Sequence, residues 1–330
     1  RLSIAKVNFV SAFASHKLSP ISRLVDSPIS QSISTDCEHS EQMETNELIK
    51  KVRQIEIKTR GLSQNIFAGQ YHSAFKGRGM SFAEVREYQM GDDIRSIDWN
   101  VTARFNHPYV KVFEEERELT FMLLIDVSGS SDFGTINQSK RSIITEAAAT
   151  LAFSSLQNND KIGVIFFSDK IEKFIAPQKG KKHVLYIIRE LIEFKPQSNK
   201  TDVSVVLQYF TSAIKKRCTA FLISDFISPD FDKALMIASK KHDMVAMQVY
   251  DLRDADLPDV GWVKMKDAET GQAMYVDTSS VEVRLRYNNH WKNHQHDLQK
   301  QMAKNRVDMV SIRTDEDYVK ALITLFRMRG

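Results

Sequence analysis

Three polar side chains follow an apolar run in the segment FMLLIDVSGS, residues 121–130. Asp126, Ser128 and Ser130 have the spacing D-x-S-x-S, so one carboxylate and two hydroxyls come at the end of a predicted buried strand. Asp and Ser are also common turn residues, and a strand-to-loop bend with local hydrogen bonds explains the motif when it is taken alone. Other parts of the chain decide whether the motif indicates a ligand site.

Two more oxygen ligands occur at comparable places. Asp225 ends a second apolar run, FLISD, and Thr201 opens the predicted helix before that run. Because parallel strands place their carboxyl ends at one edge of a sheet, these side chains can converge with the D-x-S-x-S motif. Two carboxylates and three hydroxyls suit a hard cation, Mg²⁺ first, with Mn²⁺ or Ca²⁺ as alternatives, and not zinc. Since three of the ligands are neutral, an acidic group from a partner could complete the ion's shell.

Buried strands that alternate with helices would position these ligands. Four apolar runs predict strands covered on both faces: FMLLIDVS, DKIGVIFFSD, TAFLISDF and MVAMQVYD. Helical patterns lie between them, a hairpin is predicted near 260–277, and a long polar helix is predicted from about 280 to 305. The alternation predicts an α/β fold with a doubly wound, mostly parallel sheet of the Rossmann type.

The chain divides into three parts. Residues 1–42 are Ser-rich without a sustained period, so we expect a disordered or non-native leader; a basic targeting peptide is the alternative. Residues 43–107 are predicted to form a helix and an irregular extension rich in glycine, aromatic and charged residues. Residues 108–330 are predicted to form the α/β domain, including the hairpin.

Composition excludes several classes of protein. The net charge of +4 is mild and does not require nucleic acid or a membrane as a partner. The apolar runs are too short to cross a bilayer, so no membrane insertion is expected. Two cysteines argue against a disulfide framework and favour a reducing compartment, so the expected location is cytoplasmic.

The five ligand types resemble the metal-ion-dependent adhesion site of von Willebrand factor A-like domains. In those domains the Asp and two Ser of a D-x-S-x-S loop, a Thr of a second loop and an Asp of a third surround the ion. The resemblance implies the same roles for Asp126, Ser128, Ser130, Thr201 and Asp225. It also implies a protein partner that offers an acidic residue.

The segment 75–118 resembles the signature of the bacterial family catalogued as domain of unknown function, number fifty-eight. The resemblance covers 43–330 and is carried by Gly77, Gly79, Phe82, Arg86, Tyr88, Gly91, Asp92, Arg95, Asp98, Trp99, Ala103, Arg104 and Glu116. Members of that family often sit beside MoxR-type AAA+ ATPases. The resemblance therefore implies a partner or adaptor of such an ATPase in a chaperone-like system.

The stretch GDDIRSIDW within this signature has two interpretations. Its dense charges of both signs could be a network of ion pairs and turn caps that holds the segment. Alternatively, Arg86, Arg95 and Arg104 could anchor acidic groups of a partner through paired hydrogen bonds. A second cation at the three Asp residues of this stretch has no support in the sequence.

Other functions have weaker signals. The chain lacks a G-x-x-x-x-G-K-[ST] phosphate loop and a G-x-S-x-G motif, although a Mg²⁺-dependent hydrolase using the same site is an alternative. His290 and His294 lie one helical turn apart, but a solvated polar helix face explains them better than a zinc pair. Basic residues in 50–60 and 179–183 lack the interleaved aromatics of a nucleic-acid-binding module. We expect a non-enzymatic, metal-dependent interaction module, and the sequence does not indicate its oligomeric state.

Overall fold

A six-stranded sheet forms the centre of the computed structural model, which describes residues 7–9, 53–56, 80–115, 119–132, 139–267 and 272–329. The strand order is β11-β8-β7-β4-β5-β6, and every neighbouring pair is parallel except β5 and β6. The prediction of a doubly wound, mostly parallel sheet is confirmed. The strands are β4 (Thr120–Asp126), β5 (Lys161–Phe167), β6 (Ile171–Gln178), β7 (Thr219–Ser224), β8 (Asp243–Tyr250) and β11 (Asp308–Arg313).

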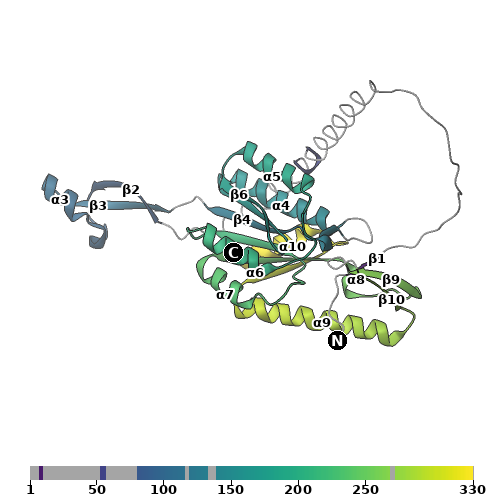
Figure 1. Cartoon of the computed structure of the whole chain (residues 1–330). Helices are drawn as coiled ribbons and strands as arrows, with labels where there is room; N and C mark the ends of the chain where they lie inside the picture. Colours follow the sequence, from purple (N-terminus) through teal and green to yellow (C-terminus); the bar gives the residue numbers. More distant parts are fainter. Residues whose placement is uncertain are drawn as a thin grey trace, which may run out of the picture.

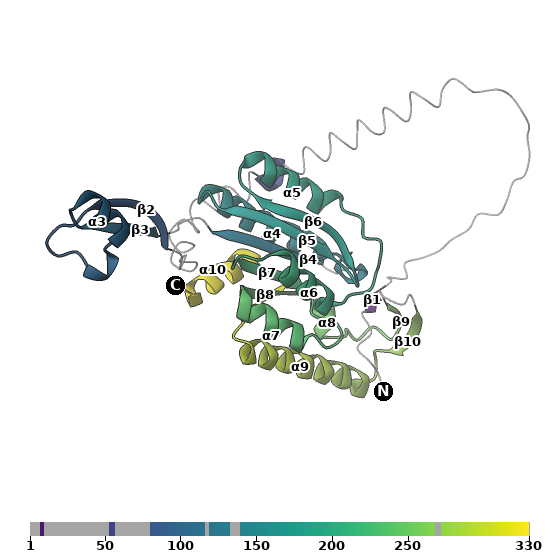
Figure 2. The same ribbon diagram turned by 60° about the vertical axis from the view of Figure 1, so that its left-hand side comes forward.

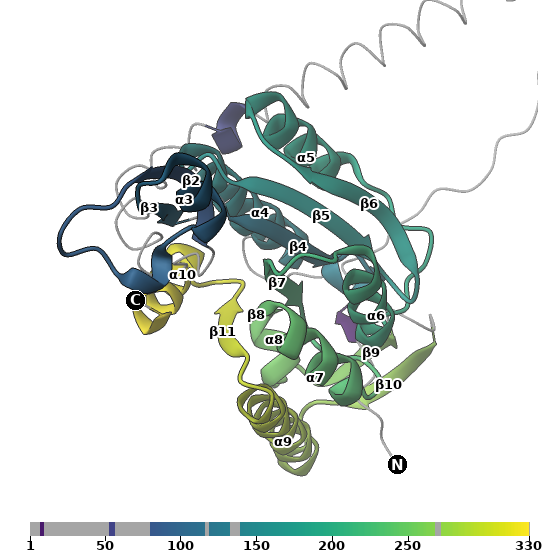
Figure 3. The same cartoon turned by 90° about the vertical axis from the view of Figure 1, so that its left-hand side faces the viewer.

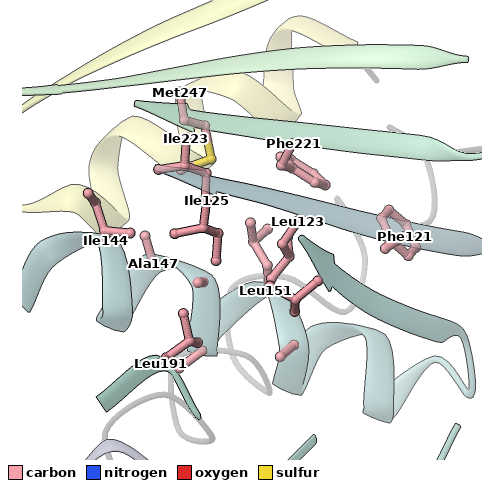
Figure 4. Close-up of a cluster of buried hydrophobic side chains, with 14 of the residues drawn as sticks. Phe121, Leu123, Ile125, Ile144, Ala147, Leu151, Leu191, Phe221, Ile223 and Met247 are labelled. Atoms are coloured by element: carbon pink, nitrogen blue, oxygen red, sulfur yellow. The ribbon is translucent and has the colours of Figure 1, made fainter. Parts of the chain in front are cut away.

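Helices cover both faces of this sheet (Figure 3). One face carries α4 (Lys140–Gln157), α5 (Lys181–Glu193) and α10 (Tyr318–Arg329), and the other carries α6 (Val203–Ala213), α7 (Asp232–Lys241) and α9 (Val281–Lys304). Alternate side chains of β4 enter the two cores. Phe121, Leu123 and Ile125 lie on the side that α4 covers, as Figure 4 shows, while Met122 and Leu124 face α6. Burial on both faces explains the uninterrupted apolar runs of the sequence.

The strand order reverses beside β4. After β4 the chain passes through α4 into β5, which is the neighbour of β4 on one side. After α6 it enters β7, which is the neighbour of β4 on the other side (Figure 2). Ligands of doubly wound sheets bind at the carboxyl ends of the strands where such a reversal opens the loops. Asp126 ends β4 and Asp225 directly follows β7, so both carboxylates lie at this point.

Residues 80–115 form a unit of their own that extends beside the amino ends of the parallel strands (Figure 1). It consists of β2 (Met80–Glu87), η2 (Ile94–Ser96), α3 (Trp99–Phe105) and β3 (Tyr109–Glu115). Strands β2 and β3 pair antiparallel, with an irregularity between Phe82 and Glu84. The segment is thus more regular than the sequence predicted. A two-stranded ribbon buries little surface, so charged residues obscured its strand period.

A second small sheet follows β8 and the short helix α8 (Leu252–Ala255). Strands β9 (Trp262–Asp267) and β10 (Ala273–Asp277) pair antiparallel, which confirms the hairpin predicted near 260–277. Residues Val7–Phe9 form β1, which pairs with β9, and the expectation of a disordered or non-native leader stays a prediction. The rest of 1–42 and most of the helix predicted after Met43 lie outside the described residues, although 53–56 are helical.

Among the helices of the described ranges, none combines the length and apolarity required to span a bilayer.

Gly163 provides a test of the packing between β5 and its neighbours. A Cβ atom at this position would lie 2.8 Å from the Ile175 carbonyl oxygen, the Met122 sulfur and the Pro177 nitrogen. Because two of these atoms belong to the backbone, Gly163→Ala should lower the free energy of unfolding by about 1–3 kcal/mol in urea denaturation. The exposed change Lys300→Ala should cost less than about 0.5 kcal/mol. Equal stability of the two variants would contradict the packing described for β5.

Candidate metal centre

Three loops meet at the carboxyl ends of β4 and β7. The loop after β4 continues into the short helix η3 (Gly129–Asp132), and it brings the hydroxyl oxygens of Ser128 and Ser130 to within 3.1 Å of each other. The backbone N–H of Ser128 donates to Asp126 Oδ1 over 2.9 Å. The backbone N–H of Gly129 donates to the Asn199 carbonyl over 3.2 Å, which joins this loop to the one that carries Thr201.

Ser224 links the third loop to the first. Its hydroxyl donates to Asp126 Oδ2 over 2.6 Å and accepts the backbone N–H of Phe226 over 3.0 Å. The backbone N–H of Ile227 donates to Asp225 Oδ1 over 3.1 Å, which orients the second carboxylate. Ser224 is not among the predicted ligands, although a hydroxyl directly before an Asp at the end of a buried strand was a usable signal.

All five predicted ligands are buried. No more than 5% of the surface of Asp126, Ser128, Ser130, Thr201 or Asp225 is exposed. Burying carboxylates and hydroxyls is costly unless hydrogen bonds or an ion compensate for lost water. The donors are all oxygen, as a hard cation requires. The residues present therefore fit the chemistry of a Mg²⁺ site.

Within the described ranges, no group of three or more His, Cys, Asp and Glu side chains lies close enough together to hold a metal ion. The predicted set is of a different kind, because it combines two carboxylates with three hydroxyls.

A buried lysine adjoins this centre. Lys140 Nζ lies 2.6 Å from Asp254 Oδ2 and 3.6 Å from Asp225 Oδ2. Burial by itself lowers the pKa of Lys140, but the charges of Asp254, Asp225 and Asp251 outweigh burial and raise the pKa above its ordinary value. The surrounding carboxylates therefore favour the charged, ammonium form of Lys140. No pattern in the sequence distinguished it from a surface lysine at the start of a helix.

Helix α9 brings His294 near the same carboxylate. Burial lowers the pKa of His294, while the charge of Asp225 opposes this shift. Its ring lies 6.0 Å from the Trp291 ring, and its Nε2 atom is buried with no hydrogen-bond partner among the described residues. The prediction of a solvated helix face is therefore wrong for His294. It holds for His290, which is exposed one turn away.

The three arginines predicted to bind a partner lie elsewhere, in the unit formed by residues 80–115 (Figure 1). Arg86 makes a paired contact with Asp92, with Nη–Oδ distances of 2.7 and 2.8 Å, while Arg95 and Arg104 are exposed. Asp93 caps η2 and Asp98 caps α3. These contacts agree with the interpretation of the charged stretch as a network of ion pairs and caps, and partner binding through the three arginines stays a prediction.

Comparison with known proteins identifies the family. Residues 84–297 match the family described as "Protein of unknown function DUF58". The chain belongs to the DUF58 family. An uncharacterised protein of Mycobacterium tuberculosis strain H37Rv is 29% identical over 287 residues, which are 86% of this chain and 90% of the relative. The uncharacterised protein YeaD of Bacillus subtilis is 30% identical over 132 residues, 40% of this chain and 29% of YeaD.

Two solved structures resemble the DUF58 chain at low sequence identity. BatB from Bacteroides thetaiotaomicron aligns with a TM-score of 0.42 and 13% identity over 64% of this chain and 98% of BatB. The VWA domain of SpRpn10 aligns with a TM-score of 0.34 and 11% identity over 64% of this chain and 95% of that domain. The fold class assigned to the DUF58 chain rests on its own strand order.

Ser224→Ala tests the hydrogen bonds that join the two strand ends in this DUF58 protein. The change leaves Asp126 Oδ2 and the Phe226 N–H without the Ser224 hydroxyl, so the free energy of unfolding should fall by about 1–3 kcal/mol. Chemical denaturation measures the loss. Ser239→Ala is the matched control, because that hydroxyl bonds an exposed helix carbonyl and its loss should be nearly neutral. A neutral Ser224→Ala would contradict the structural role of this residue.

Proposed function

We propose that this protein is a metal-dependent protein–protein interaction module. Asp126, Ser128, Ser130, Thr201 and Asp225 would hold Mg²⁺ at the reversal between β4 and β7, and an acidic residue of the partner would complete the shell. The observation that carries this proposal is the convergence of three loops whose buried Asp, Ser and Thr side chains offer five oxygen-bearing ligands. The ion would supply the positive charge that attracts the partner's carboxylate.

The charge balance supports the ion. Lys140 contributes one positive charge, whereas Asp225, Asp251 and Asp254 surround it with three carboxylates. Asp126 adds another carboxylate at the end of β4. Carboxylates gathered in a buried region repel one another, and a divalent cation would reduce that repulsion.

Exposed aromatic side chains support a protein as the partner. Trp262 and Tyr275 are 73% and 69% exposed, and the pairing of Tyr275 with Lys264 puts both rings on one face of the β9–β10 hairpin. This hairpin follows the carboxyl end of β8, so it lies toward the same end of the sheet as the candidate metal centre (Figure 1). Trp and Tyr are enriched among the residues that dominate binding energy at protein interfaces.

The class of partner comes from the family resemblance. Because family members often sit beside MoxR-type AAA+ ATPases, the proposed partner is such an ATPase, with this chain as a cytoplasmic adaptor in a chaperone-like system. The acidic residue that enters the metal shell would belong to that ATPase.

Asp126→Asn tests the metal centre with little change of shape. The neutral amide removes one of the two charged ligands, so the affinity for Mg²⁺ or Mn²⁺ should fall more than about a hundredfold. This loss exceeds the roughly 10- to 100-fold effect of removing an outer-shell contact. Isothermal titration calorimetry measures the affinity, and circular dichroism checks the fold. Asp259→Asn, which changes an exposed carboxylate paired with Arg284, should bind the ion as the wild type does. Undiminished affinity in Asp126→Asn would exclude the proposed site.

Capture of the ATPase tests the partner. The wild-type protein should retain the purified MoxR-type ATPase of the source organism at low salt with Mg²⁺, and Asp126→Asn should not. The comparison uses the mutant and not removal of the ion by EDTA, because EDTA would also remove Mg²⁺ from the nucleotide bound to the ATPase. Trp262→Ala should weaken capture roughly thirtyfold, as expected for a central aromatic contact, while metal affinity stays unchanged. Equal capture by wild type and Asp126→Asn would contradict binding through the ion.

A further inference from the structure

The position of Lys140 disfavours a positive charge for two reasons, the helix dipole and burial. It is the first residue of α4, directly after the N-cap Ser139, where the helix dipole opposes a cation. It is also 2% exposed, so its ammonium group has lost nearly all contact with water. Neither helix stability nor solvation explains a lysine here, and its function must come from the carboxylates that it contacts.

The two carboxylates beside Lys140 differ in how firmly they are held. Asp254 lies 2.6 Å from the ammonium nitrogen, and its Oδ2 also accepts the Asp251 backbone N–H over 2.8 Å. Asp251 in turn accepts the Thr314 hydroxyl over 2.7 Å, which anchors α8 to the end of β11. Asp225 lies 3.6 Å away, beyond hydrogen-bond distance. Lys140 is thus fixed to Asp254 and only electrostatically paired with Asp225.

We propose that Lys140 is a positioning residue that competes with the metal ion for the charge of Asp225 and thereby limits the affinity of the centre. This inference rests on the proposed function, because it concerns the same ion. Without the ion, Lys140 balances Asp225. When the ion binds, Asp225 neutralises the ion while Lys140 keeps its contact with Asp254. The remaining repulsion between the ammonium and the ion weakens binding.

Neutral replacements of Lys140 test this competition. Lys140→Met keeps the length of the side chain and should bind Mn²⁺ about tenfold or more tightly than the wild type in calorimetry, since one like charge near the ion is gone. In EDTA the same variant should melt at a lower temperature, because its carboxylates have lost their counter-ion. Saturating Mn²⁺ should raise its melting temperature by more than it raises that of the wild type.

Two controls separate charge from packing. Lys140→Arg keeps the charge and should leave Mn²⁺ affinity within about threefold of the wild type, a change below the charge effect. Lys304→Met removes an exposed lysine that pairs with Asp232 and should change neither affinity nor the response to Mn²⁺. Lys140→Gln serves as a second neutral variant. A neutral variant that is unfolded in EDTA should refold when Mn²⁺ is added.

The outcomes are distinct. The competition would be overturned if both neutral variants bound Mn²⁺ no more tightly than the wild type, or if both failed to fold at saturating Mn²⁺. In either case, Mn²⁺ binding by the wild type would leave the proposed function intact. A wild type that binds no Mn²⁺ would overturn both.

Discussion

The hydrogen bond from Ser224 to Asp126 joins the two strand ends on which the rest of the site depends. The strand order reverses between β4 and β7, and the loops on either side of this reversal diverge toward opposite faces of the sheet. The 2.6 Å contact keeps the carboxylate of one strand against the end of the other. The flanking cores, packed by α4 on one face and α6 on the other, hold those ends rigidly. A rigid scaffold of this kind can hold binding residues in place on the loops at its edge.

Buried polar and charged groups distinguish the edge of the sheet at the carboxyl ends of β4 and β7. The loops gather hydroxyls and carboxylates in a region with almost no exposure, and Lys140 supplies a counter-charge from the start of α4. The same lysine ties the region to α8, and Tyr287 of α9 donates to the Arg253 carbonyl of α8 over 3.1 Å. A continuous series of contacts therefore runs from the candidate ion site to the helix that follows the aromatic hairpin. The proposed metal and protein contacts would act on neighbouring parts of one surface.

Much of this arrangement could be predicted from the sequence, and the exceptions have physical causes. The apolar runs predict β4, β5, β7 and β8 because both faces of those strands are buried. The D-x-S-x-S motif and Asp225 were recognisable because they end such runs. Lys140 and His294 were not, since their roles arise from contacts between segments far apart in the chain. Strand β2 was missed because charged residues recur along a two-stranded ribbon, which buries little surface.

The proposed function requires a hard cation to bind between the ends of β4 and β7. The most direct measurement is a crystal structure of the protein grown with Mn²⁺, with anomalous scattering used to locate the ion. An anomalous peak is expected within about 2.5 Å of oxygens from Ser128 and Ser130, with Asp126, Thr201 and Asp225 completing the set of ligands. An ordered D-x-S-x-S loop with no peak there, or a peak elsewhere only, would exclude a metal site between these strand ends.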